Sequence, residues 1–512
     1  MRETMGSDGT KIRFFINGEL LFTEPGAKVS GLLDSSHGVE MPCGGRHACG
    51  KCMVYAKGAF QEPSETEKEL LGAERLEQGI RLACFLEAVP DGEIRALHKR
   101  QDSDDTICLE GAGGEHSRAS LRLYRHLGAA VDIGTTTIAA SLYQDGVLAG
   151  SMGAWNPQSV LGADVISRIE ASLEGKAQQL AALVRGAISE LLDSLAERAR
   201  ERAEDIETVV ITGNTAMLYF LTGKNPYALS RAPFEADELF GIWTSGEALG
   251  LCCKDADVYL PRCISAFVGA DITTAILGSG ICNTEQTAMM TDVGTNGEIV
   301  LFSKGRLVCC ATAAGPAFEG AGLSCGMRGV NGAIDHVKWE DGAWKVHVIG
   351  SKEAQGICGS GVIDGVAALL ESGLLDETGY LEDDVSFEGK VGLSAADIRQ
   401  VQLAKSAIRS GMETMLLLEN RNSAELDCLY VAGGFGSYMS VESAEKIGLF
   451  PPIEKEKIKI CGNAALAGAA RILHDSACEK ESAALAERAE TVNLGGNPQF
   501  QDFYMEYMMF DE

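Results

Sequence analysis

An internal duplication in the second part of the chain constrains the fold more than any other feature of the sequence. The stretch from Ala130 to Leu148 is echoed by the stretch from Met290 to Leu307. Each copy predicts a strand, an Asp-x-Gly-Thr turn, a second strand, a glycine turn and a third strand. A repeat of this kind indicates two structural halves that are built alike.

Three further features recur in the same order in both halves. Apolar residues at helical spacing are followed by a strand that runs into a glycine turn, and then by a small-residue strand-to-helix segment. The matched pairs are Gln179–Arg202 with Ile398–Glu419, Val209–Thr215 with Leu429–Gly436, and Phe267–Leu277 with Ile460–Ala470. We therefore expect two α/β lobes of related topology, at about residues 125–285 and 286–512, that face each other across a cleft.

The two Asp-x-Gly-Thr turns are suited to a nucleotide triphosphate. Glycine turns present backbone N–H groups to phosphates, and threonine hydroxyls add further donors. Asp132 and Asp292 follow the first strand of each copy, where a carboxylate can hold Mg²⁺ directly or through water. The sequence therefore predicts an MgATP site in the cleft.

The expected site draws residues from both lobes. Asp271 and Asp292 are assigned to catalysis, although Asp271 serves equally well as a helix N-cap. Gly213 and Asn214 suit a hinge or a cap as well as a ligand, and Glu298 and Glu319 are candidate bases or solvated carboxylates. The predicted nucleotide-binding residues are Asp132, Gly134, Thr135, Thr136, Gly213, Asn214, Gly294, Thr295, Asn296, Gly433, Gly434 and Gly436.

A second chemical motif lies near the start of the chain. Cys43, Cys49 and Cys52 follow the spacing C-x5-C-x2-C in a glycine-rich loop, and Cys84 stands apart as a fourth cysteine. Three thiolates from one loop and one from a distant segment are typical of a 2Fe-2S cluster, in which each iron takes two sulfurs. These four cysteines are the predicted metal ligands.

Two alternatives to the cluster stay open from the residues alone. C-x2-C also suits zinc or a pair of reactive thiols, but zinc ribbons usually supply two such pairs and this chain has one. The spacing has one residue more than the plant-type C-x4-C-x2-C and is similar to the adrenodoxin variant. His47 within the loop is expected to face solvent, because a Rieske site would need two histidines.

The surroundings of the cysteine loop predict a compact first domain at residues 1–98. Asn17-Gly18 between two apolar runs is a strong hairpin signal, residues 65–78 are expected to be helical, and residues 93–97 form a closing strand. This order resembles the β-grasp ferredoxin fold. Residues 99–124, rich in Gly and Asp, are expected to be a linker, either a mobile tether or a passive spacer.

Composition limits the class of partner. The formal net charge of -29 disfavours nucleic acid and anionic membranes, which would be repelled. The sequence shows no apolar run long enough to span a bilayer and no secretion signal, and its 16 cysteines suit a reducing compartment. We expect a cytoplasmic protein of an anaerobic cell. The closing aromatic residues 500–510 are expected to form an edge strand or a docking tail.

The two-lobed part resembles the superfamily of acetate and sugar kinases, actin and the heat-shock chaperones. The whole chain resembles the reductive activators of corrinoid proteins, in which a ferredoxin domain is joined to such an ATPase domain. The resemblance is carried by the cysteine loop, residues 131–137, 211–217, 291–298, 358–361 and 431–436. A middle region found in longer relatives is expected to be missing here, because the linker runs almost directly into Asp132.

The resemblance implies an ATP-dependent enzyme that passes one electron from a 2Fe-2S cluster to cobalt(II) of a corrinoid protein and so restores cobalt(I) for methyl transfer. The implied cofactors are the 2Fe-2S cluster, ATP and Mg²⁺. The implied partners are a corrinoid protein and a low-potential electron donor, with a homodimer favoured. The alternatives are a small-metabolite kinase with a redox-sensing ferredoxin domain, an ATP-dependent donor to another low-potential metalloenzyme, or a plain electron-transfer protein.

Overall fold

The structure is a computed structural model that describes residues 11–33, 37, 39, 41, 45, 47, 50–97, 122–284, 286–351, 353–433 and 438–510. The predicted linker lies almost entirely outside these ranges, as do Cys43, Cys49, Gly434 and Gly436. Chain contacts divide the molecule into two compact units. Of the described residues, the first unit holds 11–97, 156–184 and 225–230, and the second holds the remainder.

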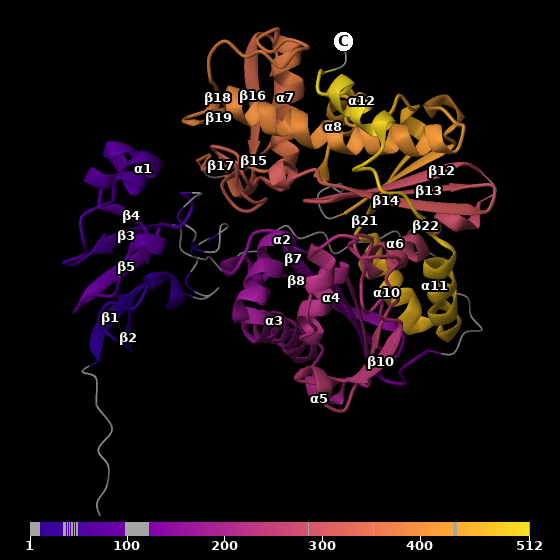
Figure 1. Ribbon diagram of the computed structural model, residues 1–512, viewed down its shortest axis with the longest axis horizontal. Coiled ribbons are helices and arrows are strands. Elements are labelled where there is room, and N and C mark those ends of the chain that lie inside the picture. Colours follow the sequence, from indigo (N-terminus) through magenta and orange to yellow (C-terminus); the bar gives the residue numbers. More distant parts are fainter. Residues whose placement is uncertain are drawn as a thin grey trace, which may run out of the picture. The chain divides into compact units, whose positions relative to one another are not determined.

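Residues 11–97 of the first unit contain a five-stranded sheet in the order β2-β1-β5-β3-β4 and the helix α1 (Figure 1). Asn17 and Gly18 both take positive φ angles, 51° and 89°, which is why the predicted two-residue hairpin turn forms here. The elements are β1 (Ile12–Ile16), β2 (Glu19–Thr23), β3 (Met53–Lys57), α1 (Glu65–Glu77), β4 (Ile80–Leu82) and β5 (Gly92–Ala96). The hairpin, the helix and the closing strand are confirmed.

The second unit contains two six-stranded sheets, and these confirm the duplication. One sheet has the order β10-β11-β9-β6-β7-β8 and the other β21-β20-β12-β13-β14-β22. In both, an antiparallel three-stranded meander pairs through its first strand with a parallel strand, β9 in one lobe and β20 in the other. The strands of the first lobe are β6 (Leu127–Ile133), β7 (Thr137–Gln144), β8 (Val147–Trp155), β9 (Thr208–Gly213), β10 (Ile242–Ser245) and β11 (Asp257–Leu260).

The second lobe carries two small sheets in addition to its main one, β16-β15-β17 and β18-β19. Its main strands are β12 (Ala288–Val293), β13 (Gly297–Ser303), β14 (Arg306–Thr312), β20 (Cys428–Ala432), β21 (Ile458–Gly462) and β22 (Glu490–Thr491). The additional strands are β15 (Ala333–Glu340), β16 (Ala343–Val348), β17 (Gly356–Ile357), β18 (Val385–Glu388) and β19 (Val391–Leu393).

The two long helices predicted at residues 179–202 and 398–419 form, at Ala177–Arg198 and Ala395–Leu418. The first half forms α2 (Val165–Ala171), α3 (Ala177–Arg198), α4 (Thr215–Thr222), α5 (Gly246–Leu249) and α6 (Ala270–Ser279). The second half forms α7 (Gly359–Ser372), α8 (Ala395–Leu418), α9 (Val441–Lys446), α10 (Ala464–His474), α11 (Ser476–Arg488) and α12 (Pro498–Glu506). None of the helices among the described residues has both the length and the apolar character needed to cross a membrane.

The two lobes meet where α6 and α10 cross (Figure 1). A Cβ atom on Gly468 would lie 1.8 Å from the carbonyl oxygen of Thr274, and one on Gly278 would lie 2.3 Å from that of Ala464. Only glycine allows two helix backbones to approach so closely. The small residues of these two matched segments therefore serve the junction between the lobes.

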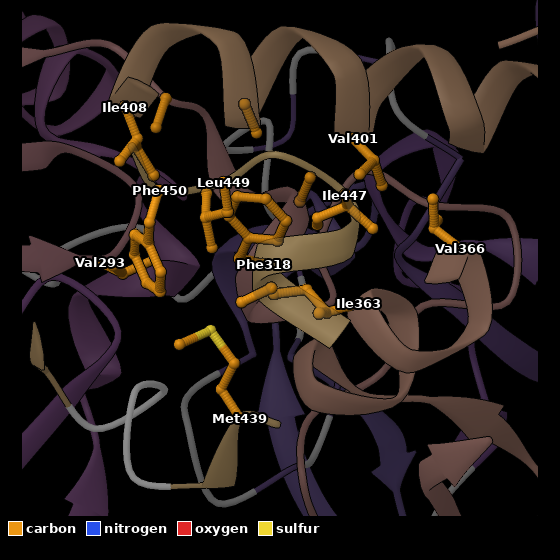
Figure 2. Close-up of a cluster of buried hydrophobic side chains, with 14 of the residues drawn as sticks. Val293, Phe318, Ile363, Val366, Val401, Ile408, Met439, Ile447, Leu449 and Phe450 are labelled. Atoms are coloured by element: carbon orange, nitrogen blue, oxygen red, sulfur yellow. The ribbon is translucent and has the colours of Figure 1, made fainter. Parts of the chain in front are cut away.

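The core of the second lobe holds one wall of the site in place. Figure 2 shows Val293, at the end of β12, and Phe318 within a cluster that includes Ile408 of α8 and Phe450. Val293 and Phe318 are 2% and 1% exposed. Because each directly adjoins a site residue, Asp292 and Glu319, packing of the core fixes the backbone at both positions.

The closing aromatic segment is a helix, so the expectation of an edge strand is wrong. Asn497 caps α12 by accepting from the backbone N–H groups of Gln499 and Phe500, and Pro498 occupies the first turn. This pairing is a strong helix start signal. The helix packs on α8, where the fully buried Lys405 donates to the backbone carbonyls of Tyr507 and Met509.

Lys405→Met is expected to lower the free energy of unfolding of the second unit by about 2–4 kcal/mol, because two backbone carbonyl groups lose their donor, a fully buried ammonium group. All four tryptophans lie in this unit, at 155, 243, 339 and 344, so urea unfolding followed by tryptophan fluorescence reports on it alone. Exposed Lys390→Met is the matched control. Equal midpoints for the two variants would contradict the role assigned to Lys405.

Candidate functional sites

A cavity of about 460 Å³ lies in the second unit and is lined by residues of both lobes. Eleven of the predicted nucleotide-site and catalytic residues line it: Asp132, Gly134, Thr135, Thr136, Asn214, Asp271, Asp292, Gly294, Thr295, Asn296 and Gly433. Gly213 ends β9 directly before Asn214 and is not part of the lining. The duplicated turns therefore face one cavity, as the sequence predicted.

Each lobe closes its turn through the N–H of the turn glycine, which donates to a carbonyl three residues later in the first lobe and two residues later in the second. In the first lobe the Gly134 N–H donates to the carbonyl of Thr137 at 2.8 Å, and in the second the Gly294 N–H donates to that of Asn296 at 3.2 Å. Gly433, at the end of β20, has φ of 95°, and a Cβ atom there would lie 2.5 Å from Oδ1 of Asp292. Glycine is therefore required at 433 to leave room for that carboxylate.

Acidic side chains gather in the cavity and disfavour one another's ionisation. Burial raises the pKa of Asp132 to about 6. Burial, and then the charge of Asp132, raises the pKa of Asp292 to about 7. Burial, followed by the charges of Asp132 and Asp292, raises the pKa of Asp271 to about 8. Burial also raises the pKa of Glu298 well above its usual value.

This group of buried carboxylates is costly to ionise unless a cation compensates its negative charge. Within the described ranges, no three His, Cys, Asp or Glu side chains are grouped closely enough to hold a metal ion by themselves. This donor set still suits Mg²⁺, which usually binds through one or two carboxylates, water and the phosphates of a nucleotide. Asp132 and Asp292 are the residues that would hold it.

Asp271 lies in the cavity and is not the N-cap of its helix. The N-cap of α6 is Gly269, and the Asp271 carboxylate accepts from the N–H of Ile272 at 2.8 Å. Asn214, by contrast, is both a cavity residue and the N-cap of α4, where it accepts from the N–H of Ala216. The expectation that Asp271 is the N-cap is thus wrong, and its catalytic role stays a prediction.

Several lining residues were missed by the sequence reasoning. The side-chain amide of Asn463 donates to Oδ2 of Asp132 at 3.0 Å and so joins the second lobe to the first. Arg328 lies over the ring of Trp155 at 4.1 Å, and this pair also bridges the lobes. The sequence did carry a signal for Asn463. Both matched segments place a polar residue shortly after a glycine: Asn463 directly follows Gly462, and Asp271 lies two positions after Gly269. Trp155 and Arg328 carried no such signal.

The raised pKa of Asp271 makes a prediction about stability. The folded protein binds a proton here that the unfolded chain, with a pKa near 3.8, releases, so stability falls as pH rises from about 4 to about 8. Asp271→Asn removes this penalty. We expect a melting temperature at least ~2 °C higher at pH 8, in the absence of nucleotide and Mg²⁺, and less than half that gain at pH 5.

Differential scanning fluorimetry of Asp271→Asn and of the exposed control Asp383→Asn at both pH values checks this. The control should show no gain that depends on pH. An equal gain for Asp271→Asn at pH 5 and pH 8 would mean that the substitution acts through packing instead of charge.

The second predicted site is described only in part, since Cys43 and Cys49 lie outside the described residues. Cys52, directly before β3, and Cys84, in the helical turn Ala83–Phe85, have their sulfur atoms 3.3 Å apart and are both buried. A tetrahedral metal with metal–sulfur bonds of about 2.3 Å places its sulfurs about 3.8 Å apart. The observed separation is shorter than this, and it places the two sulfurs close enough together to serve as two ligands of one metal.

The electrostatics of the cysteine pair agree with a metal-binding role. The hydrogen bond between the Cys52 and Cys84 side chains lowers the pKa of Cys52 to about 7, and the thiolate is the form that binds metals. Arg81, near Cys84, donates to the buried carboxylate of Glu67 through two bonds of 3.0 and 2.9 Å, which holds this segment against α1.

The loop glycines and His47 behave as expected where they are described. Gly45 and Gly50 take φ angles of 81° and 63°. His47 is exposed, as predicted, while its Nε2 contacts the carbonyl oxygen of Cys84 at 2.8 Å and its ring stacks on Phe85 at 4.1 Å. His47 therefore contacts the Cys84 segment through the backbone carbonyl of Cys84 and the ring of Phe85. These two contacts do not involve the Cys84 sulfur.

The fold and the cavity define a two-lobed protein of the class to which acetate and sugar kinases, actin and the heat-shock chaperones belong. Residues 286–512 match the family model described as the C-terminal domain of RACo, the ASKHA domain, and residues 127–284 match the model described as the RACo middle region. Both halves of the duplication are thus covered by models of one family.

Individual relatives agree with these matches. The corrinoid activation enzyme RamQ of Eubacterium limosum is 34% identical over 429 residues, which cover 75% of this chain and 70% of the relative. A [Co(II) methylated amine-specific corrinoid protein] reductase of Methanosarcina barkeri is 27% identical over 297 residues, 53% of each chain. The chain belongs to the RACo family, the reductive activators of corrinoid proteins.

One solved structure extends the likeness to nearly the whole chain. The reductive activator for corrinoid, iron-sulfur protein superposes with a TM-score of 0.70 at 25% identity and covers 98% of both chains. The expectation that a middle region is missing is wrong, because residues 127–284 match that region. What the sequence showed as the first lobe is the family's middle region itself.

Proposed function

We propose that this protein is an ATP-dependent reductive activator, which passes one electron from a 2Fe-2S cluster to cobalt(II) of a corrinoid protein and restores cobalt(I). The observation that carries the proposal is the cavity in which the duplicated turns bring Asp132 and Asp292 together, in a chain of the RACo family. RamQ and the Methanosarcina barkeri reductase are both named for corrinoid proteins.

The proposal assigns a distinct task to each site. The cluster, held by Cys43, Cys49, Cys52 and Cys84, supplies the electron. MgATP, held by the two turns, Asp132, Asp292 and the turns that begin at Gly213 and Gly433, supplies the free energy, with Asp271 and Asp292 as the carboxylates nearest the reacting phosphate. A low-potential donor would recharge the cluster, and the protein would work in the cytoplasm, with a homodimer as the favoured assembly.

Coupling to ATP has a physical reason. A plant-type cluster has a potential near about -400 mV, and each further ~59 mV uphill reduces the equilibrium yield tenfold for one electron. Binding energy from ATP can shift the equilibrium between an open and a closed arrangement of two lobes. The α6–α10 junction and the contacts of Asn463 and Arg328 across the cavity are the elements on which such a change would act.

The experiment is anaerobic and uses the full chain. The dithionite-reduced protein is mixed with a cobalt(II) corrinoid protein, excess dithionite is removed, and the cobalt(I) absorption band is followed with and without MgATP. An ATP-dependent rise supports the proposal. Equal yields with and without ATP would favour a plain electron-transfer protein, and a phosphorylated metabolite without cobalt(I) would favour the kinase.

A further inference from the structure

Glu319 makes a contact that the nucleotide site does not need for binding. It ends the short helical turn Pro316–Glu319 and is partly buried in the cavity wall. Its Oε1 accepts from the backbone N–H of Thr295 at 2.7 Å and from the Thr295 hydroxyl at 2.9 Å. Its Oε2 accepts from the hydroxyl of Thr136. One carboxylate thus joins the phosphate-binding turn of the first lobe to that of the second.

The three donors are the kind that a phosphate requires. Backbone N–H groups and threonine hydroxyls at glycine turns bind anionic oxygens, and a carboxylate competes with a phosphate for the same groups. Thr136 follows β6 and Thr295 follows β12, so they lie in the two duplicated turns where the sequence predicted phosphate contacts. Glu319 therefore takes, from within the chain, the place of a ligand anion.

The position of Glu319 is fixed by its neighbours. Phe318 is buried in the core of the second lobe, among the residues drawn in Figure 2. Gly320 follows with φ of 72°, and a Cβ atom there would lie 2.1 Å from the carbonyl oxygen of Met327. The N–H of Gly315 donates to the carbonyl of Thr295 at 2.9 Å. The helical turn Pro316–Glu319 is thus attached to the phosphate-binding turn at Thr295. Its backbone therefore holds the Glu319 carboxylate against that phosphate-binding turn.

We propose that Glu319 is an internal occupant of the phosphate site, whose carboxylate ties the phosphate-binding turns of the two lobes together until the phosphates of a nucleotide displace it. This inference rests on the proposed nucleotide function. In the nucleotide-free protein Glu319 satisfies the donors of both turns and holds the lobes in one arrangement. Binding of a nucleotide exchanges this internal anion for an external one and frees the contact between the lobes.

Because Glu319 occupies the phosphate site, it competes with nucleotide and lowers the affinity of the protein for it. The full chain, its Glu319→Ala variant and its Glu319→Asp variant are titrated calorimetrically with the Mg²⁺ complex of a non-hydrolysable ATP analogue. Removing a charge-assisted competitor should make Glu319→Ala bind about tenfold more tightly than the wild type. Glu319→Asp keeps the charge but is too short to span both turns, so it should also bind more tightly than the wild type.

Charge repulsion without occupancy makes a different prediction. In that case Glu319→Asp would bind like the wild type and only Glu319→Ala would gain, which would overturn the inference. The exposed Glu388→Ala controls for the loss of one negative charge elsewhere in the same unit and should leave the affinity within about twofold. If the wild type binds no nucleotide, the proposed function fails. If it binds and neither Glu319 variant gains, the inference alone fails.

Hydrogen exchange gives a second readout that does not depend on affinity. In the nucleotide-free state the amides of residues 133–137 and 294–297 should exchange at least about tenfold faster in Glu319→Ala than in the wild type, because the tie between the turns is lost. With saturating nucleotide the two proteins should exchange alike. Unchanged exchange of both turns in the nucleotide-free variant would contradict the tie between the lobes.

Discussion

Replacing Cys84 with serine is expected to abolish the visible absorption of the iron-sulfur cluster and to lower the rate of ATP-dependent cobalt(I) formation at least ~100-fold. Cys84 lies 3.3 Å from Cys52, sulfur to sulfur, and both are buried. A hydroxyl is a poor replacement for a thiolate, the ligand that holds iron in such clusters. Loss of the cluster removes the proposed source of the electron, so no amount of ATP should restore the product.

The measurement pairs the visible and electron paramagnetic resonance spectra with the cobalt(I) assay. Cys282→Ser is the matched control, because Cys282 is a partly buried cysteine outside both the cysteine loop and the cavity lining. The control should keep its cluster and its activity. ATP hydrolysis should survive in Cys84→Ser, since the ATP cavity belongs to the other unit. An intact cluster in Cys84→Ser would contradict the assignment of Cys84 as a metal ligand. Zinc found in place of iron would favour the zinc alternative.

Asp292→Asn is expected to lower both ATP hydrolysis and cobalt(I) formation by about 10²–10³-fold while the cluster spectrum stays that of the wild type. The substitution keeps the size of the side chain and removes the charge that would hold Mg²⁺. It also leaves the space next to Gly433 filled, so the fold should be retained. Nucleotide binding should change much less than turnover, because the turn N–H groups are untouched.

Phosphate release and cobalt(I) absorption, measured on the same preparation, check this prediction. Exposed Asp383→Asn is the control and should behave like the wild type. If Asp292→Asn hydrolyses ATP at the wild-type rate, Asp292 is not the catalytic carboxylate. If hydrolysis falls and cobalt(I) formation does not, ATP is not coupled to the electron transfer.

The sequence succeeded where chemistry is concentrated in short motifs. The Asp-x-Gly-Thr turns at Asp132 and Asp292 predicted both the two lobes and the cavity, because each turn requires its own glycine and places its own donors. The hairpin at Asn17-Gly18 was predicted for the same reason. The assignment of a 2Fe-2S cluster to four cysteines stays a prediction, since Cys43 and Cys49 lie outside the described residues.

The sequence failed where a residue acts through a partner distant in the chain. The contact of Asn463 with Asp132 spans 331 positions, and nothing local marks either residue for the other. The aromatic content of residues 500–510 predicts an edge strand or a docking tail, whereas the cap formed by Asn497 and Pro498 just before them starts a helix. The middle region that was expected to be missing is present, because the first lobe itself matches that region.

The sequence by itself determined the elements that local stereochemistry and repetition encode: the hairpin, the glycine turns, the paired helices and the duplication. Only the tertiary structure decided which side chains share a cavity and how they perturb one another. The sequence offers Asp271 equally as a catalytic residue or a helix N-cap, and in the fold burial and the charges of Asp132 and Asp292 raise its pKa to about 8. The sequence marks Glu319 only as a candidate base or a solvated carboxylate, and folding brings Thr136 and Thr295 to its two oxygens. Long-range packing sets these distances, and no pattern within one segment records them.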